Sequence, residues 1–264
     1  MRVLHGPRPR GIVAAIVPTD DSSWLAVYPG SLHSVSAVTP IGCCALWLTD
    51  LDQWVDAGQD QQECLDPLDW DRALRKPEGQ VRERFINSRV ALRRILGSLL
   101  GVYPAALHFE IDEHGKPTLA APYQHCHFNL SHSGSALLVG TRMSARIGVD
   151  IEVPRPVPRA LQLSQRVFTT EERLLLSRAA EVSEAARDET FLRIWTRKEA
   201  YLKCRGDGFT MPARDYEVGL EGSMQSDGLE IRSLELPFSG YAALASAVPI
   251  NHVRCYQLCR DDTI

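Results

Sequence analysis

The segment Gly148-Val149-Asp150-Ile151-Glu152 alternates between apolar and acidic side chains. Successive side chains of a β-strand point to opposite faces, so Val149 and Ile151 share one face while Asp150 and Glu152 share the other. Two neighbouring carboxylates repel each other unless a cation lies between them, and Mg2+ prefers such oxygen ligands, usually completed by substrate phosphates. The segment therefore predicts either a strand that binds a divalent cation or an edge strand with one face in water.

A second strand is predicted upstream, over Phe128-Asn129-Leu130-Ser131-His132-Ser133. Its apolar residues face a core, and its polar residues lie where the strand ends. The turn Gly115-Lys116-Pro117 precedes it, with glycine and proline as breakers. Lys116 and His132 could each meet a phosphate.

Zinc is the alternative for this region, because it contains three histidines and a cysteine. Their spacing matches no common zinc pattern, and no Cys-x-x-Cys pair accompanies them. The residues concerned are His125, Cys126, His127 and His132.

Downstream, Thr169-Thr170-Glu171-Glu172 begins a helix. Thr169 and Glu172 fit a capping box, in which a hydroxyl and a carboxylate bind amides at the helix start. The alternative is that this turn supplies a third metal carboxylate. Both uses need the same oxygens, so the pattern leaves Glu171 and Glu172 open.

A further helix is predicted over residues 190–204, where Trp195, Glu199 and Lys203 share one face at four-residue steps. These residues form either an exposed Glu–Lys pair, worth about 0.3–0.5 kcal/mol, or a carboxylate flanked by Lys198 and Lys203. The second arrangement would hold an anionic substrate beside a base, and both lysines would favour the ionised form of Glu199.

Helical spacing also covers residues 81–100, and an apolar run predicts a buried strand over residues 43–48. Arginines occupy the other faces of the first segment, as a solvated surface or as anion ligands: Arg82, Arg84, Arg89, Arg93 and Arg94. Residues 1–40 are rich in Pro, Gly and Ser and predict an irregular arm with one or two short strands. Helices and strands are mixed in both halves of the chain.

The chain has 264 residues, of which 44% are hydrophobic, and a net charge of -4. This composition supports a sizeable core and gives no global sign of a nucleic-acid binder. Seven cysteines at irregular spacing indicate a reduced, cytosolic protein. The apolar run at residues 11–17 is too short to span a membrane. We therefore expect a soluble cytoplasmic protein with no nucleic-acid or membrane partner.

The ordered motifs at residues 127–133, 148–152 and 195–200, with Gly115-Lys116-Pro117 ahead of them, resemble those of the 4'-phosphopantetheinyl transferases. The surfactin-synthetase-activating type is the most similar. The resemblance extends from Val81 to Val218. It implies an α+β monomer of two similar α/β subdomains, packed as an intramolecular pseudo-dimer with coenzyme A in the cleft between them. Residues 41–146 and 147–264 would be the two subdomains, and residues 1–40 an N-terminal extension beyond what the smallest family members need.

The resemblance also implies a metal site. Mg2+ would be held by Asp150, Glu152 and a third carboxylate, and by the pyrophosphate of coenzyme A. Alignment of residues 168–172 makes Glu172 that third ligand, with Glu171 as its neighbour.

Positions that contact coenzyme A follow from the same resemblance. Arg84, Lys116 and His132 correspond to ligands of the 3'-phosphate or pyrophosphate, and Asp150 meets the pyrophosphate through the metal. Pro117 and Ser131 correspond to backbone contacts. Lys198 and Lys203 match lysines near the phosphates. Glu199, beside Lys203, matches the proposed base. Arg72, Arg75 and Lys76 are candidates for additional basic residues.

The implied activity is transfer of the 4'-phosphopantetheine arm of coenzyme A to a serine of an apo acyl or peptidyl carrier protein, with release of 3',5'-ADP. The sequence does not distinguish fatty-acid, polyketide and nonribosomal peptide carriers. One alternative is a catalytically silent module that binds coenzyme A or a carrier, although such a module has no need of Asp150, Glu152 and Glu199 together. Another is a metal-dependent phosphodiesterase that uses water.

Overall fold

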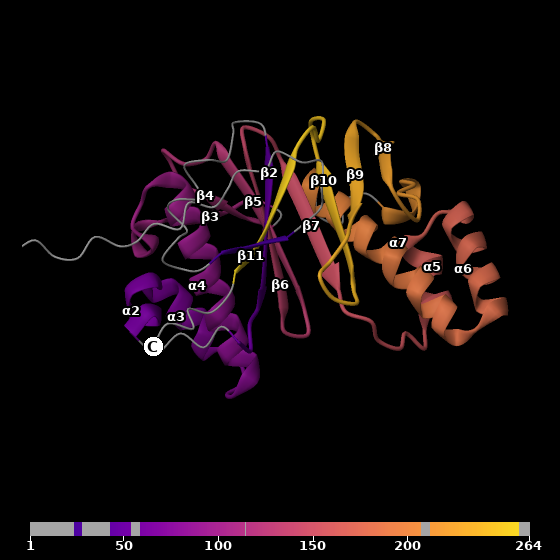
Figure 1. Cartoon of the computed structure of the whole chain (residues 1–264), viewed down its shortest axis with the longest axis horizontal. Helices are drawn as coiled ribbons and strands as arrows, with labels where there is room; N and C mark the ends of the chain where they lie inside the picture. The colour runs from indigo at the N-terminus through magenta and orange to yellow at the C-terminus, as the bar shows by residue number, and fades with distance from the viewer. Residues whose placement is uncertain (1–23, 28–42, 54–58, 114, 207–211, 259–264) are drawn as a thin grey trace, which may run out of the picture.

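Two β-sheets lie at the centre of the molecule, and helices cover their outer sides (Figure 1). The computed structural model describes residues 24–27, 43–53, 59–113, 115–206 and 212–258. Of the arm expected over residues 1–40, the strand at 24–27 is described and the remainder lies outside the described residues. The mixture of helices and strands in both halves is as predicted.

The first sheet has five strands. In spatial order they are β1 (Trp24–Val27), β11 (Val253–Leu258), β2 (Cys44–Asp50), β6 (Ala136–Met143) and β5 (Cys126–Ser133). β11 runs parallel to β1 and β2, whereas β6 is antiparallel to both β2 and β5. β5 is therefore an edge strand of this sheet.

The second sheet has four antiparallel strands. Their order is β7 (Ile147–Glu152), β10 (Tyr241–Ser246), β9 (Leu229–Leu234) and β8 (Ser223–Ser226). A separate hairpin pairs β3 (Phe109–Ile111) with β4 (Pro117–Leu119). β7 is an edge strand and lies beside β5 of the first sheet.

The helices divide between the two sheets. In the first half they are α2 (Gln59–Cys64), α3 (Pro67–Leu74), α4 (Gln80–Leu100) and the 3-10 turn η2 (Pro104–Ala106). In the second half they are α5 (Ala160–Val167), α6 (Thr170–Val182), α7 (Glu184–Arg205) and the 3-10 turn η3 (Ala213–Asp215). None of these helices, in the part of the chain that the structure describes, has the length and apolar composition needed to cross a membrane.

Alternation along the strands creates three successive cores. Trp47 of β2 packs toward α4 with Leu92 and Leu96. Residues from both sheets form the middle core, among them Leu46, Leu138, Val149 and Leu244. The third core packs α7 against the second sheet, with Leu192, Ile231 and Ala243. The layers therefore run from α4 through the two sheets to α7.

Several predicted elements have nearly the predicted bounds. The strand expected at 43–48 is β2, and the helix expected at 81–100 is α4. α7 begins at Glu184, six residues before the predicted start at 190, because the side chain of Ser183 accepts a hydrogen bond from the Ala186 amide and caps the helix.

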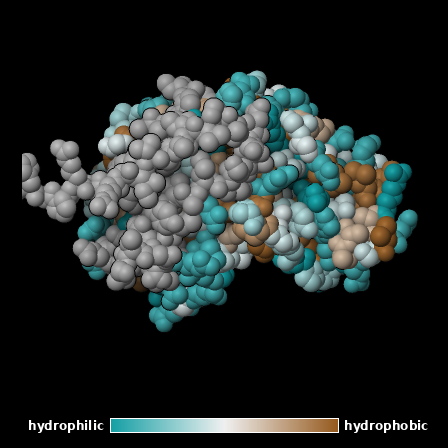
Figure 2. Space-filling model, in the orientation of Figure 1, coloured by the Kyte–Doolittle hydropathy of each residue, from teal (hydrophilic) through white to brown (hydrophobic). Residues whose placement is uncertain are grey.

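Large apolar side chains are exposed at the end of the molecule formed by α5 and α6, where Figure 2 shows brown atoms next to teal ones. The exposed side chains on these helices are Leu161, Leu163, Leu174, Leu175 and Val182. α5 and α6 are therefore amphipathic helices whose outer faces remain partly apolar.

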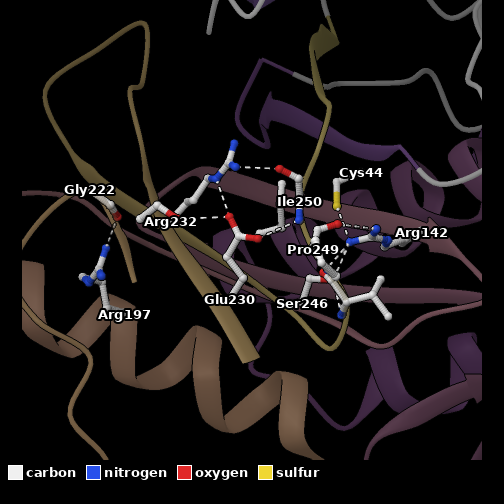
Figure 3. A network of polar contacts seen from close by, with 11 residues as sticks. Cys44, Arg142, Arg197, Gly222, Glu230, Arg232, Ser246, Pro249 and Ile250 are labelled. Atoms are coloured by element: carbon white, nitrogen blue, oxygen red, sulfur yellow. Dashed lines mark hydrogen bonds and ion pairs between the residues drawn. The ribbon is translucent and has the colours of Figure 1, made fainter. Parts of the chain in front are cut away.

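A crossover carries the chain from β10 back to the first sheet, so residues 253–258 pair with β2 although they follow the second sheet in sequence. Figure 3 shows how side chains hold it. Arg142 of β6 donates to the carbonyls of Val248 and Pro249 at 3.2 and 2.9 Å. From β9, Glu230 accepts from the Ile250 amide at 2.7 Å, and Arg232 donates to the Ile250 carbonyl at 2.6 Å. Both sheets thus bind the crossover.

Gly148 generates the first prediction, because β7 passes very close to α7 at this residue. A Cβ at position 148 would lie 2.1 Å from the Ala200 carbonyl oxygen and 2.4 Å from the Cys204 amide nitrogen. Gly148→Ala should therefore force the strand and helix apart and lower the free energy of unfolding by about 3 kcal/mol or more, at or beyond the usual range for overpacking. Urea denaturation measures this loss.

Gly140→Ala is the matched control. A Cβ there would meet the side chain of Val149 at 2.6 Å rather than backbone atoms. Side chains adjust more easily than a helix backbone, so this variant should lose less stability. Equal losses in the two variants would contradict the assigned role of the β7–α7 contact.

Candidate active site

The candidate site is built where β7 meets α7. Val149 and Ile151 lie in the core between the sheets. Gly148 is on the opposite face, against the backbone of α7. Strand alternation places Asp150 and Glu152 on the same face as Gly148. The predicted pair of acidic side chains therefore faces the helix that carries Glu199 and Lys203.

Asp150 is buried, with 4% of its surface exposed. Its Oδ1 accepts hydrogen bonds from Ser131 Oγ and Lys203 Nζ, both at 2.6 Å. Its Oδ2 is also buried and has no hydrogen-bond partner among the described residues. Burial raises the pKa of Asp150, and the negative charge of Glu152 raises it further. Lys203 and Ser131 lower it. One oxygen of this carboxylate is thus fixed and the other is available to a ligand.

Glu152 lies near the surface end of the strand. Its Oε2 accepts a hydrogen bond from Ser133 Oγ at 2.7 Å. Its Oε1 lies 3.2 Å from Nη2 of Arg155, whose side chain is 48% exposed. The contact to serine comes from the neighbouring strand β5, and the contact to arginine comes from a solvated side chain.

Glu199 is the third carboxylate of the site. Its pKa is raised, first by burial and then by the negative charges of Asp150 and Glu152, while Lys203 lowers it. Lys203 favours the ionised form of Glu199, as expected, but Lys198 is not among the groups that act on it, since its ammonium binds Glu172. Burial and the acidic neighbours outweigh Lys203, so the net shift in the pKa is upward.

The structure does not bring Glu172 to the other two predicted metal ligands. The capping box is present: Oε2 of Glu172 accepts from the Thr169 amide at 2.9 Å. Oε1 accepts from the Val218 amide at 2.8 Å, and Lys198 Nζ lies 3.0 Å from Oε2. The side chain is fully buried. Its oxygens are occupied by structural partners, so the capping interpretation holds and the metal prediction for Glu172 does not. Glu171 is exposed in the first turn of the same helix.

Lys198 is likewise not among the phosphate-binding groups that the structure offers. Its Nζ binds Glu172 and donates to the carbonyls of Ala213, at 2.9 Å, and Tyr216. Burial lowers its pKa and Glu172 opposes this. Lys198 and Glu172 together hold the segment that follows residues 207–211.

Lys116 comes from the hairpin of the first half and reaches α7. Its Nζ donates to the Lys203 carbonyl at 2.6 Å, at the C-terminal end of the helix, where cations are favoured. Burial lowers the pKa of Lys116. Pro117 begins β4 and pairs with Ile111. Lys116 from the first half of the chain therefore lies against the residue of α7 that carries the Lys203 side chain.

Arg84 and His132 are placed nearer the surface. His132 is exposed on β5. Arg84 forms a two-point ion pair with Asp52, with distances of 2.7 Å from Nε and 2.5 Å from Nη2. The hydrogen bond from Arg84 is the main cause of the lowered pKa of Asp52. Arg84 thus binds a carboxylate in a geometry that also suits a phosphate.

The carboxylates of the site are the groups that could bind a metal ion. The described residues contain no group of three His, Cys, Asp or Glu side chains close enough to hold a metal ion. However, Asp150 has a buried oxygen that no described residue binds, and negative neighbours make the ionised forms of Asp150 and Glu199 more costly. These features fit a hard divalent cation with oxygen ligands. The zinc alternative has no such support: Cys126 is in the apolar core beside α4 and its pKa is raised to about 11 by burial.

Sequence reasoning missed the side chains that support the carboxylates. Ser131 was expected to act through its backbone, yet its hydroxyl binds Asp150. Ser133 was not singled out, although it binds Glu152. The alternation of polar residues along β5 was a signal that could have identified both.

Comparison with known proteins gives a consistent result. Residues 146–232 match the family model described as the 4'-phosphopantetheinyl transferase superfamily. The chain is 37% identical over 165 residues to the 4'-phosphopantetheinyl transferase HetI of Nostoc sp., covering 62% of this chain and 68% of HetI. It is 30% identical over 166 residues to the 4'-phosphopantetheinyl transferase Sfp of Bacillus subtilis, covering 59% of this chain and 68% of Sfp.

A third relative, the 4'-phosphopantetheinyl transferase AcpT of Escherichia coli, is 38% identical over 133 residues, which cover 49% of this chain and 61% of AcpT. The matches to HetI and Sfp thus span about two thirds of those proteins, and the match to AcpT spans less.

The buried pair of Glu172 and Lys198 generates the second prediction. Lys198→Ala should lower the free energy of unfolding by about 3–5 kcal/mol, because it leaves the Glu172 carboxylate buried without its counter-ion. Chemical denaturation measures the loss. The control is Arg75→Ala, which removes an ion pair to Asp71 whose side chains are 74% and 56% exposed. That variant should unfold like the wild type. Similar stability in both variants would contradict the structural role of Lys198.

Proposed function

The chain belongs to the 4'-phosphopantetheinyl transferase superfamily, and on that premise we propose that it transfers the 4'-phosphopantetheine arm of coenzyme A to a serine hydroxyl of an apo acyl or peptidyl carrier protein. The second product is 3',5'-ADP. The observation that carries this proposal is the convergence of Asp150, Glu152, Glu199 and Lys203 at the β7–α7 contact. A catalytically silent binding module is not favoured.

Two similar subdomains, residues 41–146 and 147–264, would form the pseudo-dimer, with residues 1–40 as an extension. The cofactor would lie along the junction of β5 and β7. The origin of the candidate residues supports this: Ser131 and Lys116 come from the first half, whereas Asp150 and Lys203 come from the second. We further propose that the protein acts as a cytoplasmic monomer without nucleic-acid or membrane partners.

Family members generally use a divalent metal, and Mg2+ is the ion we propose here. Asp150 and Glu152 would hold it, with Glu199 in place of Glu172 as the third carboxylate. The electrostatic coupling of Glu199 to both strand carboxylates supports this choice, as does the engagement of Glu172 elsewhere. When bound, the ion would neutralise charge on the pyrophosphate and on the departing 3',5'-ADP.

Basic side chains around the junction would bind the phosphates of coenzyme A. Lys203 and Lys116 lie at the end of α7. His132 is exposed on β5, and Arg84 would exchange its contact with Asp52 for a phosphate. Pro117 and Ser131 would offer backbone groups. Lys198 is not one of these phosphate-binding residues, because its ammonium is held by Glu172 and two carbonyls.

The reaction needs a proton acceptor near the carrier serine, and Glu199 is the proposed base. The serine oxygen would form a bond to the phosphorus next to pantetheine, and the bond from that phosphorus to 3',5'-ADP would break. Glu199 would take the hydroxyl proton. Burial and acidic neighbours raise the pKa of Glu199, which makes it a stronger base than an exposed glutamate. Lys203 would hold the anionic product.

The direct test is incubation with coenzyme A and a panel of apo carrier proteins, followed by intact-protein mass spectrometry. A transferase adds phosphopantetheine to a carrier. Release of 3',5'-ADP from coenzyme A without a carrier would instead indicate the phosphodiesterase. The panel also identifies which carrier is modified.

The third prediction concerns the base. Glu199→Gln keeps the size of the side chain and removes its charge. Turnover should fall about a hundredfold or more, within the range of general-base catalysis, whereas coenzyme A binding measured without Mg2+ should change little. Steady-state transfer and calorimetric affinity should be measured on the same variant. Unchanged turnover would exclude Glu199 as the base.

The fourth prediction concerns Arg84. Arg84→Ala should weaken binding of coenzyme A about tenfold or more, the value of one charge-assisted contact, with less effect on dephospho-coenzyme A. Arg82→Ala is the control, because Arg82 lies on the same helix and pairs with the exposed Glu78. Equal weakening of both ligands by Arg84→Ala would reject the 3'-phosphate assignment.

A further inference from the structure

The candidate site crosses a boundary between two sheets. β5 is the edge strand of the five-stranded sheet and β7 is the edge strand of the four-stranded sheet. They lie side by side, yet among the described residues each pairs through its backbone only within its own sheet. The position of one strand relative to the other must therefore depend on side chains.

Three polar side chains of β5 supply those contacts. Asn129 Oδ1 accepts from the Val149 amide at 2.9 Å. Ser131 Oγ donates to Asp150 Oδ1 at 2.6 Å. Ser133 Oγ donates to Glu152 Oε2 at 2.7 Å. The three side chains alternate along β5 on the face opposite Phe128, so they form a regular row that we name the β5–β7 seam.

Ser133 is held more tightly than a single hydrogen bond would require. Its hydroxyl donates to Glu152 and also accepts from the Val153 amide at 3.1 Å. A serine hydroxyl has one proton to donate and lone pairs to accept. Both functions are used here, so the orientation of the hydroxyl is fixed at both ends. The residue is also buried, with 8% of its surface exposed.

We propose that Ser131 and Ser133 are positioning residues, which fix the carboxylates of Asp150 and Glu152 across the seam so that their other oxygens face a divalent cation. This inference rests on the proposed metal role of those carboxylates. Ser133 is the new member, since neither the motif comparison nor the chemistry of the transfer assigns it a role.

The contacts on each carboxylate are asymmetric in the way that this role requires. Ser131 and Lys203 both bind Oδ1 of Asp150, and within the described part of the chain the buried Oδ2 has no partner. On Glu152, Ser133 binds one oxygen, and the other meets Arg155 at 3.2 Å, an exposed side chain that a cation can displace. The serines hold one oxygen of each pair and leave the other to the ion.

A purely structural role is the competing explanation, in which the hydroxyls only satisfy polar groups in the seam. The two explanations differ in what the loss of a hydroxyl does to metal binding. Partners behind metal ligands typically change metal affinity about 10–100-fold when removed. A structural hydroxyl changes stability and leaves affinity unchanged.

The test uses Mn2+ as a probe for the metal site, with its binding to the full chain followed by electron paramagnetic resonance. Ser133→Ala should weaken Mn2+ binding about tenfold or more. Ser164→Ala is the matched control: Ser164 is also a buried serine, and its Oγ donates to the Leu161 carbonyl at 2.8 Å, within α5. That variant should bind Mn2+ like the wild type.

Asp150→Ala separates failure of this inference from failure of the proposed function. If Asp150→Ala loses Mn2+ binding while Ser133→Ala binds like the wild type, the metal site stands and the inference is overturned. If Asp150→Ala binds like the wild type, the metal site itself is wrong and the inference falls with it.

A second measurement needs no metal. Because Ser133 Oγ accepts from the Val153 amide, hydrogen exchange at that amide should become at least several-fold faster in metal-free Ser133→Ala than in Ser164→Ala. Unchanged exchange would show that the seam does not hold Val153, and the inference would be overturned on that ground as well.

Discussion

The close approach of β7 to α7 at Gly148 determines the geometry of everything around it. A strand and a helix can approach this closely only where no Cβ separates them, and a Cβ here would lie 2.1 Å from a helix carbonyl. The contact sets the distance of Asp150 and Glu152 from the helix. It also sets which turn of α7 they meet, so the ammonium of Lys203 reaches Asp150.

Two neighbouring residues of α7 serve different layers because a helix turns by about 100° per residue. Glu199 faces the carboxylates of β7, whereas Lys198 faces the core and binds Glu172. Arg197 is also buried, and donates to the carbonyls of Val218 and Gly222 at 2.6 and 2.8 Å. Arg197 and Lys198 thus hold the segment that follows α7, whereas Glu199 remains available for chemistry.

The sequence predicted those features that depend on one local period. The alternation of apolar and acidic residues in β7 correctly predicted that Val149 and Asp150 lie on opposite faces of the strand. Helical spacing placed Glu199 and Lys203 on one face of α7. It could not resolve Glu172, because a helix cap and a metal ligand require the same carboxylate and the choice depends on Val218 and Lys198, distant in sequence. The return of β11 to the first sheet is also a long-range contact. Alternation along β5 marks its polar face, but it does not say that this face meets β7.

The site combines three carboxylates with one nearby lysine that binds Asp150. This excess of negative charge lowers the stability of the fold. The folded pKa values of Asp150 and Glu199 are raised, largely by burial. An acid with a raised folded pKa favours folding while it is protonated, and it loses that contribution as pH rises from the unfolded pKa through the folded pKa. At neutral pH both groups therefore oppose folding when ionised. A bound cation would offset their repulsion, so the arrangement that makes Glu199 a stronger base also makes the fold favour an ion beside it.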